Sequence, residues 1–124
     1  MTPKQSIGEF STKCTTLTFI PGAAGSVIVQ ANFEGTATGF GIVCGTMNAS
    51  PAGQPNGTFD SCVVSYPESG DGLTGIGRGT FSRSGPNRWR TQGPLQLSDG
   101  RTIYGEGELD LASRVWSGKM YAAG

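Results

Sequence analysis

The chain has 124 residues, and its nine Lys or Arg residues balance its nine Asp or Glu residues, so the formal net charge is zero. A chain of this length forms one domain with a modest core, and we expect neither a nucleic acid nor a membrane as a partner because no basic stripe or cationic amphipathic stretch occurs. The absence of histidine excludes Ser-His-Asp and Cys-His catalysis, histidine metal sites and a histidine general base.

The chain has three cysteines, Cys14, Cys44 and Cys62, and none of them belongs to a CxxC motif. An odd number at irregular spacing is not typical of a disulfide framework or a zinc site. We therefore expect buried, reduced thiols, no metal and a cytoplasmic location. The first ten residues also lack the apolar segment of a signal peptide.

Segments rich in Thr, Val and Gly alternate with turn signals such as IPGAAG, NASPAGQPNG, YPESGDG and SDG. No window has a helical period, and glycine costs a helix about 1 kcal/mol per site relative to alanine. Short strands between regular turn signals are typical of an antiparallel sandwich or barrel. We predict an all-β fold, a single meander of seven or eight antiparallel strands closed into a small barrel over residues 1–124. The expected strands are 6–19, 26–33, 36–47, 57–66, 72–83, 88–97, 101–110 and 114–122, with 48–56 as the longest irregular stretch.

In the first half of the chain, Glu34-Gly35 indicates a two-residue hairpin turn. Side chains alternate between the two faces of a strand. Pairing about this turn predicts that the inward residues are Val27, Val29, Ala31, Phe33, Thr36, Thr38, Phe40, Ile42 and Cys44.

The strand expected at 57–66 has two dissimilar faces. One carries Phe59, Ser61, Val63 and Ser65, and the other carries Asp60, Cys62, Val64 and Tyr66. If the second face is inside, Asp60 is a desolvated carboxylate with a raised pKa that could act as a general base beside Tyr66. The alternative, which the pattern favours, is an exposed Asp60 near a turn.

The hairpin around Ser98-Asp99-Gly100 allows two registers. A two-residue turn would place Glu106 and Glu108 on the same face as Trp89, where burial of unpaired carboxylates costs several kcal/mol. A three-residue turn with Gly100 in the left-handed conformation places apolar residues opposite each other and opposite charges side by side. We predict this second register, with pairs Leu95–Ile103, Trp89–Leu109, Arg90–Glu108 and Gln92–Glu106.

A following loop at Ala112-Ser113 extends the pattern, with Leu109 opposite Trp116, Glu106 opposite Lys119 and Tyr104 opposite Tyr121. Glu106 and Glu108 then belong to a solvated charge ladder. They become the leading catalytic candidates if that face points inward.

The opposite face of these strands is rich in glycine. It comprises Leu73, Gly75, Gly77, Gly79, Phe81, Arg83, Trp89, Thr91, Gly93, Leu95, Leu97, Ile103, Gly105, Gly107, Leu109, Trp116, Gly118 and Met120. One interpretation is a ligand cavity beside Trp89 and Trp116, with space left by the glycines. The other is that the glycines permit the kinks of a small barrel and aromatic rings fill the gap.

The candidate site residues follow from this inner face. Asp60, Tyr66 and Arg83 are the candidate catalytic groups reaching the cavity. The candidate ligand-binding residues are Phe40, Phe81, Trp89, Leu109, Trp116 and Met120. The segment GIGRGTF, residues 75–81, lacks the GxGxxG spacing and a following helix, so it is not a dinucleotide loop.

The meander along the whole chain, the strand LTGIGRGTF and the terminal hairpins RWRTQGPLQLSDGRTIYGEGELDLASRVWSGKMY resemble small bacterial antiparallel barrels of the calycin kind. The layout is most similar to the barrel shared by allene oxide cyclases and spirotetronate-type polyketide cyclases. The resemblance is architectural and transfers no functional residue. It implies a cofactor-free cyclase or isomerase that folds a flexible apolar substrate inside the barrel.

Two functions of different classes are therefore expected. The first is a cofactor-free cyclase, isomerase or lyase acting on a small hydrophobic metabolite bound inside the barrel. The second is a non-catalytic, lipocalin-like binder of a small hydrophobic ligand, and a packed barrel without a ligand is a third possibility. Tyr104, Tyr121 and Ile76 on the outer face also predict a homodimer.

Overall fold

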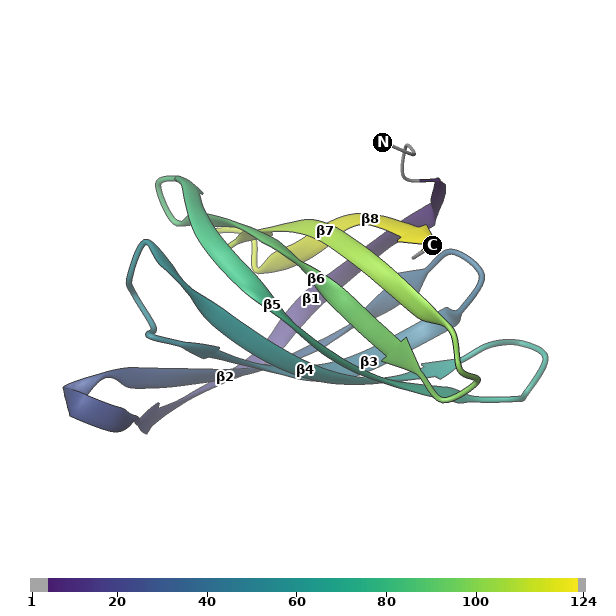
Figure 1. Ribbon diagram of the computed structural model, residues 1–124, viewed down its shortest axis with the longest axis horizontal. Helices are drawn as coiled ribbons and strands as arrows, with labels where there is room; N and C mark the ends of the chain where they lie inside the picture. The colour runs from purple at the N-terminus through teal and green to yellow at the C-terminus, as the bar shows by residue number, and fades with distance from the viewer. Residues whose placement is uncertain (1–4, 123–124) are drawn as a thin grey trace.

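The computed structural model describes residues 5–122. Eight antiparallel strands follow one another around a closed barrel, in which the last strand pairs with the first (Figure 1). The elements are β1 (Ser6–Pro21), the short helix η1 (Ala23–Gly25), β2 (Val27–Ala37), β3 (Gly41–Ser50), β4 (Asn56–Tyr66), β5 (Leu73–Gly85), β6 (Arg88–Leu97), β7 (Thr102–Asp110) and β8 (Val115–Ala122). The prediction of an all-β antiparallel meander closed into a barrel is confirmed.

The two ends of the barrel are named here after one residue each. The Phe40 end carries the turns at residues 38–40, 67–72 and 98–101, together with the start of β1 and the end of β8. The Trp89 end carries the connections at residues 22–26, 51–55, 86–87 and 111–114. The described residues contain no helix that is long and apolar enough to cross a membrane.

The register predicted for the terminal hairpins is confirmed. Leu95 lies opposite Ile103, Trp89 opposite Leu109 and Leu109 opposite Trp116. At the turn, the backbone N–H of Gly100 donates to the Leu97 carbonyl at 3.0 Å, and Gly100 has a φ of 94°. This is the left-handed glycine that the three-residue turn requires.

The predicted turn at Glu34-Gly35 is wrong, because both residues lie inside β2 and the chain reverses at residues 38–40. Gly35 lies opposite Thr12, and a Cβ atom on Gly35 would collide with the Ser11 carbonyl. The absence of a side chain at Gly35 therefore allows β1 to pack closely against β2, and Gly35 does not form a turn. Ala31, Phe33 and Phe40 are buried as expected. The phase of the other residues after Phe33 is reversed: Thr36, Thr38 and Ile42 are exposed, and β3 buries Val43, Met47 and Ala49.

Two further expectations also need correction. The irregular stretch is shorter than 48–56, since β3 continues to Ser50 and β4 begins at Asn56. All three cysteines are free thiols, but Cys14 alone is buried, whereas Cys44 is half-buried and Cys62 is exposed. Cys62 belongs to the outer face of β4, where it alternates with inward-facing residues.

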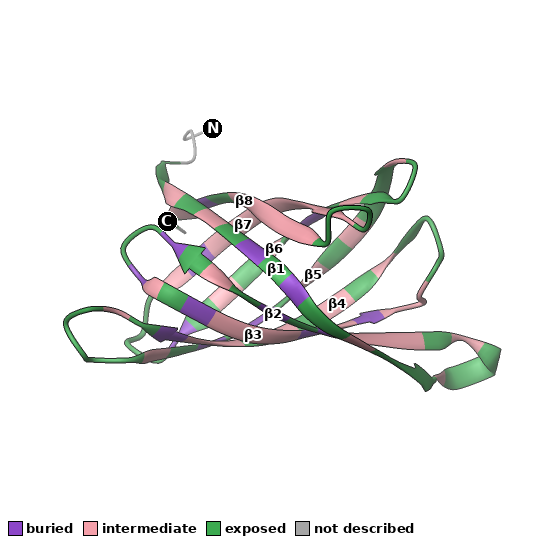
Figure 2. Cartoon of the chain, turned by 180° about the vertical axis from the view of Figure 1, so that it is seen from behind, coloured by how far each residue is buried: buried purple, intermediate pink, exposed green. Residues whose placement is uncertain are grey.

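The core consists of two clusters of buried residues, which appear as short purple segments on the strands in Figure 2. The first cluster lies toward the Phe40 end and contains Ala37, Phe40, Val43, Leu97, Ile103 and Met120. The second lies toward the Trp89 end and contains Cys14, Ala31, Phe33 and Met47. The buried side chains near the first cluster do not fill the interior, and the space that remains is the candidate site.

Candidate functional site

A cavity of about 160 Å³ lies inside the barrel beside the first cluster. Its apolar wall is formed by side chains from most of the strands. Those toward the Phe40 end include Ala37, Phe40, Val43, Leu73, Leu97 and Ile103. The wall surrounds a partly open apolar space on the face for which the sequence left a cavity and a packed interior as alternatives.

The aromatic ring of Trp116 is the floor of this cavity. Its centroid lies 5.7 Å from that of Phe10, 5.1 Å from that of Phe33 and 6.0 Å from that of Phe59. The contacts with Phe10 and Phe59 are edge-to-face, the geometry that aromatic quadrupoles favour. These rings join strands β1, β2, β4 and β8, and all four line the cavity.

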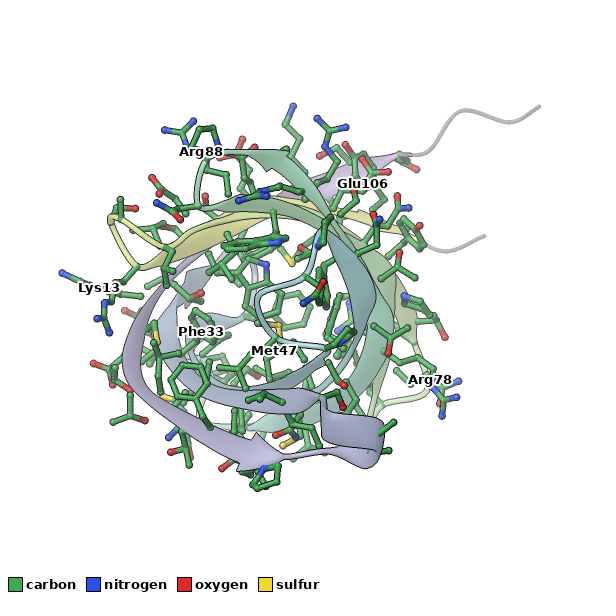
Figure 3. All side chains as sticks on the ribbon, turned by 90° about the vertical axis from the view of Figure 1, so that its left-hand side faces the viewer. Lys13, Phe33, Met47, Arg78, Arg88 and Glu106 are labelled. Carbon is green, nitrogen blue, oxygen red and sulfur yellow. The ribbon has the colours of Figure 1, made fainter. Side chains whose placement is uncertain are left out.

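Figure 3 looks into the barrel from the Trp89 end, with Phe33 and Met47 pointing inward and Lys13, Arg78, Arg88 and Glu106 pointing away. The loop at residues 51–55 is tied across this end. Ala52 N–H donates to the Val27 carbonyl at 2.7 Å, and Arg83 N–H donates to the Pro55 carbonyl at 2.7 Å. The indole N–H of Trp89 donates to the Gln54 carbonyl at 3.3 Å. These bonds fix the loop at the Trp89 end, where the second cluster also lies.

The glycines of the inner face do not all leave space. A Cβ atom on Gly105 would have one neighbour within 4 Å, the Gly93 carbonyl at 3.9 Å, and Gly105 lines the cavity. A Cβ atom on Gly107 would lie 2.9 Å from the Phe10 ring, and one on Gly118 would collide with the Glu106 carbonyl. Both interpretations of the glycine-rich face therefore hold, at different positions: Gly105 leaves volume, while Gly107 and Gly118 permit close approach of neighbouring strands.

The inward-facing polar side chains of the cavity wall are hydroxyls, and Arg78, which also lines the cavity, points away from the barrel (Figure 3). Thr12 Oγ1 donates to the Trp116 carbonyl at 2.8 Å, and Thr91 Oγ1 accepts a hydrogen bond from the Trp116 indole at 3.0 Å. Ser65 Oγ accepts from the Leu73 N–H at 3.3 Å, and Ser61 adds a fourth hydroxyl. Among the described residues, no buried side-chain nitrogen or oxygen lacks a hydrogen-bond partner, so burial of these groups carries little penalty.

The three candidate catalytic residues do not meet in the cavity. Asp60 is exposed on the outer face of β4, where its carboxylate accepts a hydrogen bond from Asn48 Nδ2 at 3.1 Å. Tyr66 is 57 % exposed on the same face, and Arg83 is exposed at the Trp89 end. The inward alternative for Asp60 and Tyr66 is wrong, and the exposed Asp60 that the pattern favours is confirmed. The opposite face of β4 packs the half-buried Phe59 and Val63 against the core and leaves the carboxylate hydrated.

Three of the six candidate ligand-binding residues line the cavity, and three do not. Phe40, Trp116 and Met120 line the cavity. Phe81, Trp89 and Leu109 share the inner face but lie closer to the Trp89 end, where Leu109 packs against the second cluster. Phe10 and Thr12 of β1 also line the cavity and were not predicted, although the alternation that buries Thr12 and Cys14 is a signal that could have found them.

At the Phe40 end, the Arg101 guanidinium carbon lies 5.5 Å from the centroid of the Phe40 ring. Arg101 also binds Asp99 twice, through its backbone N–H at 3.0 Å and through Nε at 2.8 Å. These interactions, the backbone hydrogen bond first, hold the pKa of the Asp99 carboxyl below its usual value. The three residues therefore form a connected group at the edge of the cavity.

The charge ladder lies on the outer face, as predicted. Glu106 is opposite Lys119, and Glu108 is opposite Arg90 but lies 3.8 Å from Arg88. Both glutamates border an open depression of about 470 Å³ over β6–β8. Within residues 5–122, no three His, Cys, Asp or Glu side chains gather closely enough to hold a metal ion.

Comparison of the chain with protein-family models, with curated proteins and with solved structures found no match.

Proposed function

We propose that this protein binds a small apolar molecule, of about the size of one aromatic ring, inside the barrel. The observation that carries the proposal is the cavity of about 160 Å³ with its apolar wall. Apolar protein cavities of about 150 Å³ accommodate benzene. Pockets for larger metabolites measure about 300–1,000 Å³, so the volume favours a single ring or a short branched chain.

The polar groups of the wall support the same ligand class. The hydroxyls of Thr12 and Thr91 and the indole of Trp116 are engaged with one another or with the backbone. They therefore do not require a polar ligand to satisfy them. Ser61 places one hydroxyl on the wall, where it can contact a single polar atom of the ligand, such as a phenolic oxygen.

The closed eight-stranded barrel fits the architecture that the sequence resemblance implies. We also propose that the protein is a barrel of the calycin kind, similar to the barrel of allene oxide cyclases. Barrels of eight strands have an interior just wide enough for side chains or one small ligand, which supports a binder built in the manner of a lipocalin.

The enzymatic alternative, a cofactor-free cyclase, isomerase or lyase, stays a prediction. Such an enzyme needs a polar group held inside with a shifted pKa. The cavity wall offers hydroxyls, whereas Asp60, Tyr66 and Arg83 do not line it. The binder is therefore the better-supported of the two functions.

Two other expectations also stay predictions: the cytoplasmic location and the homodimer. Ile76 is 71 % exposed on the outer face of β5. Tyr104 and Tyr121 are half-buried on β7 and β8. Light scattering at increasing protein concentration tests the homodimer directly.

The proposal is tested by titrating the protein with fluorobenzene and following the ¹⁹F NMR signal of the ligand. We expect saturable binding to the wild type and loss of binding in Gly105→Leu, because the new side chain occupies the cavity. Gly85→Leu is the matched control, since Gly85 lies at the end of β5 and does not line the cavity. Absence of saturable binding to the wild type, or equal binding by Gly105→Leu, would contradict the proposal.

A further inference from the structure

Phe40 lies where the cavity meets the Phe40 end of the barrel. The residue is flanked by two glycines in the left-handed region, Gly39 with a φ of 80° and Gly41 with a φ of 75°. Its backbone N–H donates to the Ala37 carbonyl at 3.0 Å. This tight turn directs the ring inward, so that Phe40 is 8 % exposed although it belongs to a surface turn.

The outer face of this ring contacts a residue from another hairpin. Arg101 follows the β6–β7 turn, and its guanidinium carbon is 5.5 Å from the Phe40 centroid. The Arg101 side chain is 56 % exposed, whereas the Phe40 ring lines the cavity. The ring therefore lies between a solvent-exposed guanidinium and the apolar cavity.

Asp99 fixes the position of Arg101. Its carboxylate accepts hydrogen bonds from the Arg101 backbone N–H and from Nε. A guanidinium held through Nε has lost part of its rotational freedom, so less entropy is lost when it stacks on the ring. The contact joins the β2–β3 turn to the β6–β7 turn across the end of the barrel.

We propose that the Phe40 ring is a gate that narrows the cavity at this end and that Arg101, held by Asp99, is the latch that holds the ring in place. Rotation of this one side chain widens the path, and no strand pair has to separate. The 51–55 loop and the second cluster occupy the opposite end. The identity of what passes the gate rests on the proposed function, but the gate itself can be tested without a ligand.

The first test measures access to Trp116, which forms the cavity floor. The chain has two tryptophans, so Trp89→Phe leaves Trp116 as the sole reporter of collisional quenching by acrylamide. Because this substitution also removes the hydrogen bond from Trp89 to the Gln54 carbonyl, every variant is compared with Trp89→Phe alone. In this background we expect Arg101→Gln to raise the quenching constant by about two- to fivefold, as loss of one exposed cation–π contact implies. Phe40→Ala should raise it further. Arg114→Gln, at the Trp89 end, is the matched control and should leave it unchanged.

The second test measures exchange of fluorobenzene by ¹⁹F line shape in the same variants. Arg101→Gln should accelerate entry and exit together, so the exchange rate rises while the dissociation constant stays within about twofold. Because Arg101 is exposed, this variant is expected to fold even if Phe40→Ala does not.

The outcomes separate the two proposals. If quenching rises in Arg101→Gln while fluorobenzene binds to no variant, the gate stands and the proposed ligand class falls. If fluorobenzene binds but Arg101→Gln changes neither quenching nor exchange, the gate is overturned and the binding function stands. Equal effects of Arg114→Gln and Arg101→Gln would also overturn the gate, since they would indicate general loosening.

Discussion

The indole N–H of Trp116 donates a hydrogen bond to the hydroxyl of Thr91 at 3.0 Å, across the intervening strand β7. The bond passes over Gly107, which lies opposite both Thr91 and Gly118. A Cβ atom on Gly107 would lie 3.2 Å from Thr91 Oγ1. The absence of a side chain at Gly107 therefore leaves room for this hydrogen bond. The bond in turn fixes the orientation of the Trp116 ring, which forms the cavity floor.

Thr91→Val removes the acceptor while keeping the shape of the side chain. We expect the free energy of unfolding to fall by about 1–3 kcal/mol, because the partly buried indole N–H loses its partner. Urea denaturation followed by circular dichroism measures the change. Thr91→Ser keeps a hydroxyl and should lose less. Equal stability of Thr91→Val and the wild type would contradict the importance of this bond.

Gly107→Leu and Gly105→Leu should differ in stability although they lie two residues apart on the same face. At Gly107 the new side chain would press on the Phe10 ring and on the Ser117 carbonyl, each 2.9 Å from its Cβ. Overpacking of this kind costs about 1–3 kcal/mol. Thermal melting should therefore show Gly107→Leu to be the less stable variant. The reverse order would show that the free volume lies beside Gly107.

Ser61→Ala tests the polar contact assigned to the cavity wall. We expect the variant to bind fluorobenzene as the wild type does, because the apolar wall is unchanged. Binding of phenol should weaken by about three- to tenfold, the effect of one neutral hydrogen bond. Parallel NMR titrations with the two ligands provide the measurement. A phenol affinity that does not change would remove Ser61 from the site.

Glu108→Gln should have little effect on stability or ligand binding. Glu108 lies on the outer face, and its nearest cation, Arg88, is 3.8 Å away with a side chain that is 55 % exposed. Exposed pairs contribute about 0–1 kcal/mol. Chemical denaturation at low and high salt and a fluorobenzene titration give the two readouts. Loss of binding in this variant would mean that the glutamate face takes part in the site.

The lowered pKa of Asp99 implies that the contribution of this carboxylate to stability decreases on acidification. Its pKa is lowered in the folded protein, so its ionised form stabilises the fold above the carboxyl's ordinary pKa of about 3.9. This contribution is lost as the pH falls through the lowered folded-state pKa. The difference in melting temperature between the wild type and Asp99→Asn should therefore be largest near neutral pH and shrink below about pH 4. A difference that grows on acidification would contradict the assignment.

The terminal hairpins could be predicted because their information is local. Cross-strand pairs such as Trp89–Leu109 and Arg90–Glu108 discriminate between two registers that differ by one residue. Gly35 could not be placed in the same way. A glycine is needed at this position because the Ser11 backbone, which is distant in the sequence, packs against it. From the local sequence alone, a glycine inside a strand cannot be distinguished from a glycine in a turn.

The site could be predicted less completely for the same reason. The inner face containing Gly105 and Gly107 followed from alternation, but which glycine leaves space depends on the ring that arrives from β1. Phe10 fills the volume beside Gly107 and leaves that beside Gly105 open. The position of Asp60 was ambiguous because both faces of its strand carry apolar residues, and the choice depends on what the neighbouring strands bury.

The pairing of β1 with β8 has a consequence for how the chain folds. Thr12 Oγ1 donates to the Trp116 carbonyl across a separation of 104 residues, whereas each other strand pair joins neighbours in the meander. The hairpins can thus form early. The barrel, however, closes only when β1 pairs with β8, and pairing of strands so far apart in the sequence is intrinsically slow. Until then β1 and β8 are unpaired edges that can recruit another chain. The cavity inside the barrel exists only after β1 and β8 have paired, so closure of the barrel and creation of the cavity are the same folding event.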